Sequence, residues 1–152
     1  MKKDRGGPDA RLGASLEFMR VLWATDHGLQ ATSKWMQANL GVTAQQRLVI
    51  RILGLRPEMS AGDLARTLHV HPSTLTGVLQ RLERRGLVRR RSDPGDRRRV
   101  ILVLTARGHQ LERSLEGTVE AAVGRALRRL PPRAVAAARR VLMALADELE
   151  RR

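Results

Sequence analysis

The 152-residue chain carries 29 lysines and arginines against 15 aspartates and glutamates, which gives a formal net charge of +14. It contains no cysteine and no tyrosine, and aromatic residues make up 2% of it. This composition excludes disulfides, thiolate-bound zinc and thiol-based redox sensing, and it disfavours a protein that stacks unpaired bases on aromatic rings. No apolar run approaches the roughly 18–20 residues that a membrane span requires. No apolar stretch follows the basic N-terminus, so we expect neither a transmembrane protein nor a secretory signal.

The positive charge is concentrated in the middle of the chain. Residues 43–104 carry thirteen bases and five acids, and the 19 residues from Arg81 to Arg99 hold nine arginines and three acids. Residues 1–42 and 105–152 have net charges of only +2 and +4. A GC-rich genome would account for arginine replacing lysine but not for this clustering. The cluster indicates a surface for a polyanion, with nucleic acid as the leading candidate.

Residues 1–42 predict a frayed arm followed by two helical stretches. Apolar residues recur at spacings of three and four, which predicts a helix from about Ala10 to Ala24. Gly28 and Gly41 delimit a second, shorter stretch.

The next helix is predicted to begin at a capping box. Thr43 and Gln46 have the required spacing, and Pro57 prevents the helix from continuing. Its expected apolar face consists of Leu48, Val49, Ile52, Leu53 and Leu55.

A tight pair of helices follows. Ser60 can cap the first, and the turn after it contains His69, a residue type that tolerates the left-handed conformation. Pro72 suits the first turn of the second helix, which is predicted to end at Gly86. The front of this second helix presents small or polar residues, namely His71, Ser73, Thr74, Thr76 and Gly77.

The last third predicts a hairpin and then helices. Two short strands, residues 87–91 and Val100–Leu104, flank a turn with a Pro-Gly pair. Helix returns at Thr105, and one apolar stripe runs from Leu111 to Leu130, where two prolines break it. A second stripe runs from Val135 to Leu149.

A hydroxyl-fronted helix followed by an arginine-rich hairpin is what a major-groove reader needs. Small side chains let the helix backbone approach base edges, while arginines bind phosphates. Taken alone, the hydroxyl residues are equally consistent with an ordinary first helical turn. The alternative for the arginine run, a solvated charged face, is the weaker interpretation.

Residues from about Thr43 to Leu104 resemble the winged helix-turn-helix of MarR-type transcriptional regulators. The segments that carry the resemblance are 64–68, 73–76, 81–88, the triplet Asp96-Arg97-Arg98, and 100–105. The flanking helices also resemble the family, so the similarity covers nearly the whole chain.

The resemblance implies a mainly α fold with a small β-hairpin wing, and dimerisation helices at both ends. Residues 71–85 would be the recognition helix, Asp96 would brace the wing, and Arg98 would enter the minor groove. The DNA-binding residues expected on this basis are Ser73, Thr74, Thr76, Gln80, Arg81, Arg97 and Arg98. The chain departs from the family at Gly77 and Gln80, where many relatives carry arginine and aspartate, so the base code stays open. His69 replaces the usual turn glycine.

The same resemblance implies three segments and a two-fold dimer. Residues 1–42 would form an arm with dimerisation or linker helices, 43–104 the DNA-binding domain, and 105–152 the C-terminal dimerisation helices. The terminal apolar stripes need burial, either against a second protomer or within one chain. Two recognition helices about 34 Å apart would read a pseudo-palindromic operator.

Small phenolic or lipophilic ligands often release DNA in this family, from a crevice between the dimerisation helices and the reading head. The candidate crevice residues are Met19, Trp23, Trp35 and Met36, which could equally be core residues. We expect no metal site, because two histidines belong to the reading head and the other two are isolated.

Other classes are weaker. An enzyme is disfavoured because no phosphate cradle, paired-histidine metal motif or nucleophile elbow is present. An architectural DNA-coating protein would share the charge, and a membrane-surface protein lacks its aromatic anchors here. We therefore predict a cytoplasmic, homodimeric MarR-type regulator of double-stranded DNA, most plausibly a repressor, without a cofactor.

Overall fold

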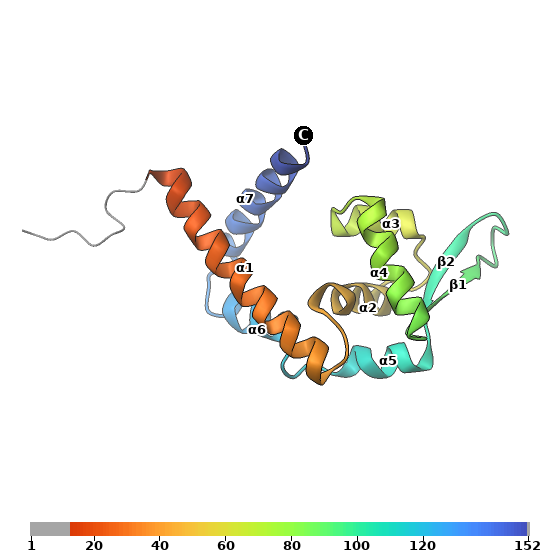
Figure 1. Ribbon diagram of the computed structural model, residues 1–152. Coiled ribbons are helices and arrows are strands. Elements are labelled where there is room, and N and C mark those ends of the chain that lie inside the picture. Colours follow the sequence, from red (N-terminus) through yellow and green to blue (C-terminus); the bar gives the residue numbers. More distant parts are fainter. Residues whose placement is uncertain (1–12, 152) are drawn as a thin grey trace, which may run out of the picture. The chain divides into compact units, whose positions relative to one another are not determined.

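The computed structural model describes residues 13–151, and within them the chain forms seven helices and one two-stranded sheet (Figure 1). It divides into two compact units, one up to Ser114 and one from Leu115 onward. The three-segment division expected from the sequence stays a prediction. The elements are α1 (Ala14–Asn39), α2 (Ala44–Leu55), α3 (Ala61–Leu68), α4 (Pro72–Arg84), β1 (Val88–Ser92), β2 (Val100–Leu104), α5 (Ala106–Arg113), α6 (Val119–Leu127) and α7 (Pro132–Glu150).

The predicted starts of α2 and α3 are confirmed by hydrogen bonds. Thr43 Oγ1 accepts from the Gln46 amide at 3.2 Å, and Gln46 Oε1 accepts from the Thr43 amide at 3.0 Å. Ser60 and Asp63 form the same reciprocal capping box on α3. His69 ends α3 in the left-handed conformation, with φ 51° and ψ 49°. These local signals therefore determine where the helix-turn-helix begins and turns.

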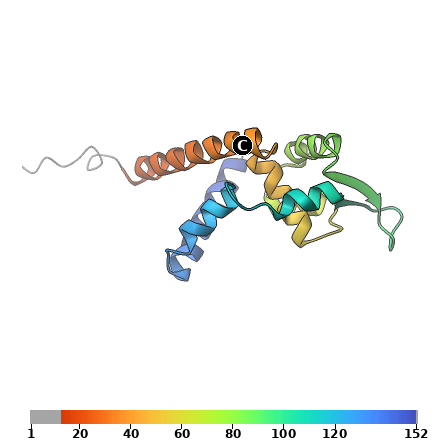
Figure 2. The ribbon, with the colours of Figure 1, turned by 90° about the horizontal axis from the view of Figure 1, so that it is seen from below.

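The wing is an antiparallel hairpin in which Val88 pairs with Leu104 and Ser92 with Val100. Strand β2 is tied to the segment between α2 and α3, because the Leu102 amide donates to the Met59 carbonyl at 2.8 Å. Figures 1 and 2 both show the hairpin extending away from the helices of its unit. The mainly helical winged helix-turn-helix fold is confirmed.

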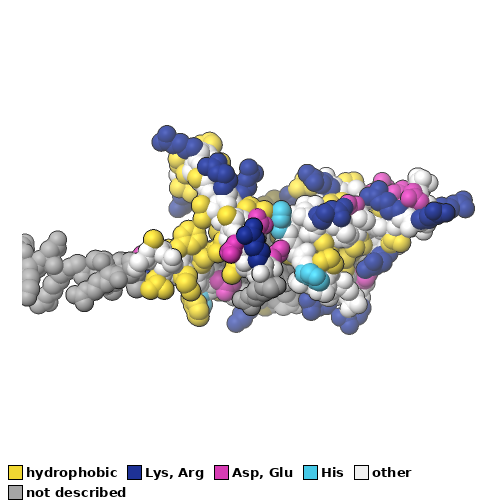
Figure 3. All heavy atoms as spheres, turned by 90° about the horizontal axis from the view of Figure 1, so that it is seen from above, with side chains coloured by type: hydrophobic (Ala, Val, Ile, Leu, Met, Phe, Trp, Pro, Cys, Tyr) yellow, Lys and Arg dark blue, Asp and Glu magenta, His cyan; other side chains and the backbone are white. Residues whose placement is uncertain are grey.

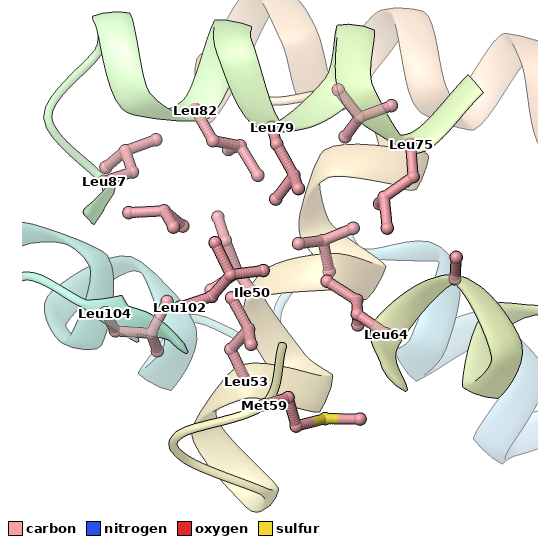
Figure 4. Packing of buried hydrophobic residues seen from close by; sticks show 14 of the residues in the cluster. Ile50, Leu53, Met59, Leu64, Leu75, Leu79, Leu82, Leu87, Leu102 and Leu104 are labelled. Carbon is pink, nitrogen blue, oxygen red and sulfur yellow. The ribbon is translucent and has the colours of Figure 1, made fainter. Parts of the chain in front are cut away.

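The core of the first unit lies between α2, α3, α4 and the hairpin. Figure 4 shows leucines of α4 pointing toward Ile50, Leu53, Leu64 and Leu102. Each of these four residues is at most 1% exposed. Burial of this kind is worth about 1.5–3 kcal/mol for each large aliphatic side chain, so the core fixes the orientation of α4.

The end of α5 is held by a buried arginine. Arg47 of α2 is 2% exposed and donates to the carbonyls of Leu111 and Glu112, the latter at 2.9 Å. Arg51, one turn further along α2, pairs with the Glu112 carboxylate. A cation at these last carbonyls favours the helix end electrostatically.

The expected break at Gly28 is wrong. The helix α1 continues through it for 26 residues, and Figure 2 shows one uninterrupted rod. A glycine within a helix costs about 1 kcal/mol relative to alanine, and residues on both sides have helical conformations that support it. The N-terminal part of the predicted helix, residues 10–12, lies outside the described residues.

Two other expectations are also corrected. The stripe from Leu111 to Leu130 is not one helix, because Gly117 adopts φ +72° and Thr118 caps a new helix by accepting from the Ala121 amide. The apolar face of α2 is shifted as well. Leu48 and Leu55 are exposed, and the buried position that periodicity missed is Ile50.

The second unit differs from the first in the burial of its helices. Neither α6 nor α7 contains a buried residue, and large apolar side chains are exposed on both. Across residues 13–151, no helix combines the length and the hydropathy that crossing a bilayer demands.

Candidate nucleic-acid interface

The structure holds α4 by one face and exposes the other. Leu75, Val78, Leu79 and Leu82 are buried. The predicted contact residues of this helix all lie on its exposed side, namely Ser73, Thr74, Thr76, Gln80 and Arg81. The helical repeat of 3.6 residues separates the two sets.

The N-terminal turn of α4 is organised by its own hydroxyls and by a histidine. His71 Nδ1 accepts from the Ser73 amide at 3.3 Å and lies 2.7 Å from Ser73 Oγ. Thr76 Oγ1 donates to the Pro72 carbonyl at 2.9 Å, which leaves its acceptor lone pairs outward. A Cβ atom added at Gly77 would meet nothing within 4 Å. The exposed front of α4 therefore carries short, polar side chains, which suits close approach of the helix to base edges.

The tip of the wing is a polar turn held by aspartates. Asp96 Oδ1 accepts from the Arg98 amide at 3.0 Å, and the Asp96 carbonyl accepts from the Arg99 amide at 2.9 Å. The side chains of Arg97 and Arg98 are exposed, and within the described part of the chain neither forms a hydrogen bond or an ion pair. Figure 3 shows dark blue side chains at the right-hand tip of the molecule, where this hairpin ends.

Arg99 differs from its two neighbours because its side chain is already paired with aspartates. Its guanidinium donates to Asp63 Oδ2 at 3.0 Å and to Asp93 Oδ2 at 3.2 Å. Asp63 also accepts from Ser60 and pairs with Arg66. Hydrogen bonds from the Ser60 hydroxyl and amide, with Arg99 next in strength, lower the pKa of the Asp63 carboxyl below its ordinary 3.8. Arg99 thus ties the wing to the start of α3.

Two further arginines of the basic cluster are also paired. Arg90 donates to Glu83 at 2.7 Å, and Arg91 donates to Glu58 at 2.7 Å. Sequence reasoning missed Asp63 and the pairs of Arg90, Arg91 and Arg99. The Ser-x-x-Asp spacing at Ser60 could have found Asp63, but no local pattern identifies which arginine pairs.

The predicted crevice residues occupy separate parts of α1. Met36 is fully buried, whereas Met19, Trp23 and Trp35 are exposed. From residue 19 to residue 36 the helix rises by about 25 Å, so the four do not form one cavity within a protomer. The effector site stays a prediction. In the part of the chain that the structure describes, no three His, Asp or Glu side chains gather as a metal site.

Comparisons with known proteins agree with this geometry. A sequence profile for the MarR family matches residues 42–100. The HTH-type transcriptional repressor Rv2887 of Mycobacterium tuberculosis is 37% identical over 91 residues, which are 60% of this chain and 66% of the repressor. The chain therefore spans just under two thirds of the length of that relative.

Solved structures extend the similarity to most of the chain. The transcriptional regulator PA4135 is 33% identical, with a TM-score of 0.61 over 90% of this chain and 98% of its own. CouR of Rhodococcus jostii RHA1, solved with p-coumaroyl-CoA, is 27% identical. The alignment covers 83% of this chain and 89% of CouR, with a TM-score of 0.68. The helix-turn-helix, its arginine-tipped wing and these similarities lead to one conclusion: the chain belongs to the MarR family of winged helix-turn-helix transcriptional regulators, which are not enzymes.

Proposed function

We propose that this protein is a repressor that binds a pseudo-palindromic DNA operator as a homodimer in the cytoplasm. The observation that carries the proposal is that the exposed α4 face, with its short polar side chains, and two unpaired wing arginines lie on one compact unit. The 37% identity to a transcriptional repressor supports repression over activation.

In this proposal α4 enters the major groove. Ser73, Thr74, Thr76 and Gln80 contact base edges, and Arg81 contacts a phosphate. The turn braced by Asp96 presents Arg98 to the adjacent minor groove, where narrow A·T-rich steps have the most negative potential. Arg97 contacts the flanking backbone.

The exposed apolar residues of the terminal helices support the homodimer. Trp23, Leu16 and Met19 on α1 are all more than half exposed, as are Leu142 and Leu149 on α7. A monomer rarely leaves this much apolar surface in contact with water, and a closed two-fold pair buries the same patch on both copies.

The wing is tested by replacing Arg98 with alanine. Operator selected from random DNA fragments should bind Arg98→Ala about 1–3 kcal/mol more weakly, with an unchanged circular dichroism spectrum. Arg99→Gln serves as a contrast, because it removes the same charge from a side chain that is already paired. Equal operator affinity of wild type and Arg98→Ala would remove the wing from the interface.

The role of the recognition helix is tested by placing a bulky side chain on its exposed front. Thr76→Trp should abolish preference for the selected operator while sedimentation still shows the wild-type oligomer. If the variant selects the same site, another surface reads the DNA.

An architectural DNA-coating protein is the alternative that the net charge of +14 favours. Titration against excess random DNA at two salt concentrations separates the two. A regulator should bind its operator about 10³-fold or more tightly than random DNA, whereas an architectural protein loses binding evenly to the competitor.

We further propose that a small lipophilic or phenolic ligand relieves repression. CouR, a 27% identical structure, was solved with p-coumaroyl-CoA. Exposed Trp23 and Trp35 offer the aromatic surface that such a ligand would contact in the dimer. Quenching of their fluorescence by phenolic acids, together with release of operator DNA, is the expected result.

A further inference from the structure

A hollow of about 350 Å³ lies beside the recognition helix, and Arg81 is the one residue of its lining that is also among the operator contacts proposed above. It is lined by Gln37 of α1, Thr43 and Gln46 of α2, and Arg81, Arg84 and Arg85 of α4. We call it the α1–α2–α4 hollow. Three of its six lining residues are cationic and none is acidic.

The three guanidinium groups have no carboxylate partner among the described residues. The only acid on α4 is Glu83, and its carboxylate is already bound to Arg90 of β1. The first turn of α2 contains no acid either, so nothing there offsets the partial positive charge of that helix end. Three like charges around one hollow repel each other, and a bound anion would remove that cost.

One of the neutral lining residues offers a hydrogen-bond donor. Gln46 is 4% exposed, and its Oε1 is used in the capping box on the Thr43 amide. Its Nε2 group has no hydrogen-bond partner within residues 13–151. A nearly buried amide donor therefore lines the hollow together with the guanidiniums.

The turn between α1 and α2 makes room for one of these guanidiniums. Gly41 has φ +72°, a conformation that side chains disfavour, and a Cβ atom there would lie 2.6 Å from Arg85 Nη2. The guanidinium of Arg85 thus packs directly on the backbone of the turn, at the edge of the hollow.

We infer that the α1–α2–α4 hollow binds a phosphate-class anion, held by Arg81, Arg84 and Arg85 with the Gln46 amide as a further donor. Arginine forks match the oxygen geometry of phosphate, and charge-assisted hydrogen bonds of this kind are about twice as strong as neutral ones. The phosphate has two possible sources, the operator backbone or a small phosphorylated effector. With the operator as source the inference rests on the proposed function and adds an anchor formed by the end of α4 and the start of α2, separate from the wing.

The test compares Arg84→Gln and Arg85→Gln with a matched control. Arg56→Gln removes the same charge from an exposed residue at the opposite end of α2 from Thr43. Arg84→Lys retains the charge at the hollow. All are compared in the full chain with wild type and with Arg98→Ala.

Two measurements are made on each variant. The first is affinity for operator and for random DNA as a function of salt. The second uses no DNA and follows the melting temperature with increasing inorganic phosphate or pyrophosphate, with chloride at equal ionic strength as reference.

If the operator supplies the phosphate, each hollow variant lowers affinity for both DNAs by the same factor. The slope of log affinity against log salt then falls by about one per protomer, while Arg56→Gln leaves the slope unchanged and Arg84→Lys restores most of it. If a free ligand supplies it, the slopes do not change, but phosphate raises the melting temperature of wild type and Arg56→Gln more than that of the hollow variants.

The inference is overturned if the hollow variants match Arg56→Gln in both measurements. Failure of the proposed function looks different, because then wild type and Arg98→Ala bind operator and random DNA alike. In that case the phosphate titration still shows whether the hollow binds an anion.

Discussion

The winged helix and the terminal helices of this chain differ in how they bury apolar residues. All the buried apolar residues of the described chain lie between Met36 and Leu104. The outer helices, α6, α7 and most of α1, carry apolar residues that stay exposed or only partly buried. Apolar residues at helical spacing therefore have two outcomes, an intramolecular core in one region and exposed apolar surface in the other.

This difference shows that an apolar stripe in the sequence does not reveal whether other residues of the same chain will bury it. In the winged helix three helices and a hairpin converge on Ile50 and Leu53, so each stripe meets another (Figure 4). Stability of the winged helix should be intrinsic, whereas stability of the terminal helices should depend on protein concentration. Three experiments test this contrast, and a fourth tests the base of the wing.

The largest effect is expected in the core. Leu79 is 1% exposed, so Leu79→Ala should lower the free energy of unfolding by about 2–5 kcal/mol. Urea denaturation at fixed protein concentration measures it. Leu127→Ala, at a 42% exposed position of α6, should cost a monomer less than about 0.5 kcal/mol. Equal losses at the two positions would mean that the regions do not differ.

The second effect concerns association. Trp23 is 80% exposed, and truncating a tryptophan anchor at an interface typically costs about 2 kcal/mol or more. Trp23→Ala should therefore weaken the dimer by about 30-fold or more, as measured by sedimentation equilibrium. Leu55→Ala removes an exposed apolar side chain of the winged helix and should leave association unchanged. A wild-type dissociation constant for Trp23→Ala would place the interface elsewhere.

The third effect compares helix caps in the two regions. Thr118 is 1% exposed, accepts from the Ala121 amide and donates to the Leu115 carbonyl at 2.7 Å. Thr118→Ala and Thr43→Ala should each cost about 0.5–2 kcal/mol, but only the loss at Thr118 should vary with protein concentration. Thr118→Ser keeps the hydroxyl and should stay near wild type. Identical concentration dependence for both alanine variants would argue against a partner-dependent second unit.

The smallest effect is a pH dependence at the base of the wing. The pKa of Asp63 is lower in the folded protein than its ordinary 3.8, so the unfolded chain takes up the proton first. The stability that Asp63 contributes is present above that value and is lost as the pH falls through the lowered folded pKa. Chemical denaturation at a series of pH values should show wild type more stable than Asp63→Asn near neutral pH, with the difference shrinking below about pH 4. A constant difference would mean that the carboxylate charge contributes nothing.

Sequence reasoning succeeded where structure is determined locally. The caps at Thr43 and Ser60 and the left-handed turn at His69 depend on atoms within three residues of each other. Gly28 and Gly117 show the limit. Both interrupt apolar patterns, yet the chain continues as helix through the first and turns at the second with φ +72°. Local propensity is too weak to separate these outcomes, because flanking residues and packing decide them.

The candidate site divides in the same way. The exposed side of α4 and the Asp96 turn follow from helical period and turn chemistry. The role of Arg99 does not, because its partner Asp63 lies 36 residues away and three adjacent arginines look alike in sequence. The α1–α2–α4 hollow was also missed, since its residues come from three helices that only the folded chain brings together.

The arginine that caps α5 has a mechanical consequence. Arg47 and Arg51 grip the last turn of α5 at Leu111 and Glu112, three residues before the second unit begins. A twist applied to the chain beyond Ser114 cannot be absorbed by unwinding that turn without stripping a buried cation of its acceptors. The C-terminal boundary of the first unit is therefore held by two arginines of α2, and loosening it would leave the buried Arg47 cation without the carbonyls that it now binds.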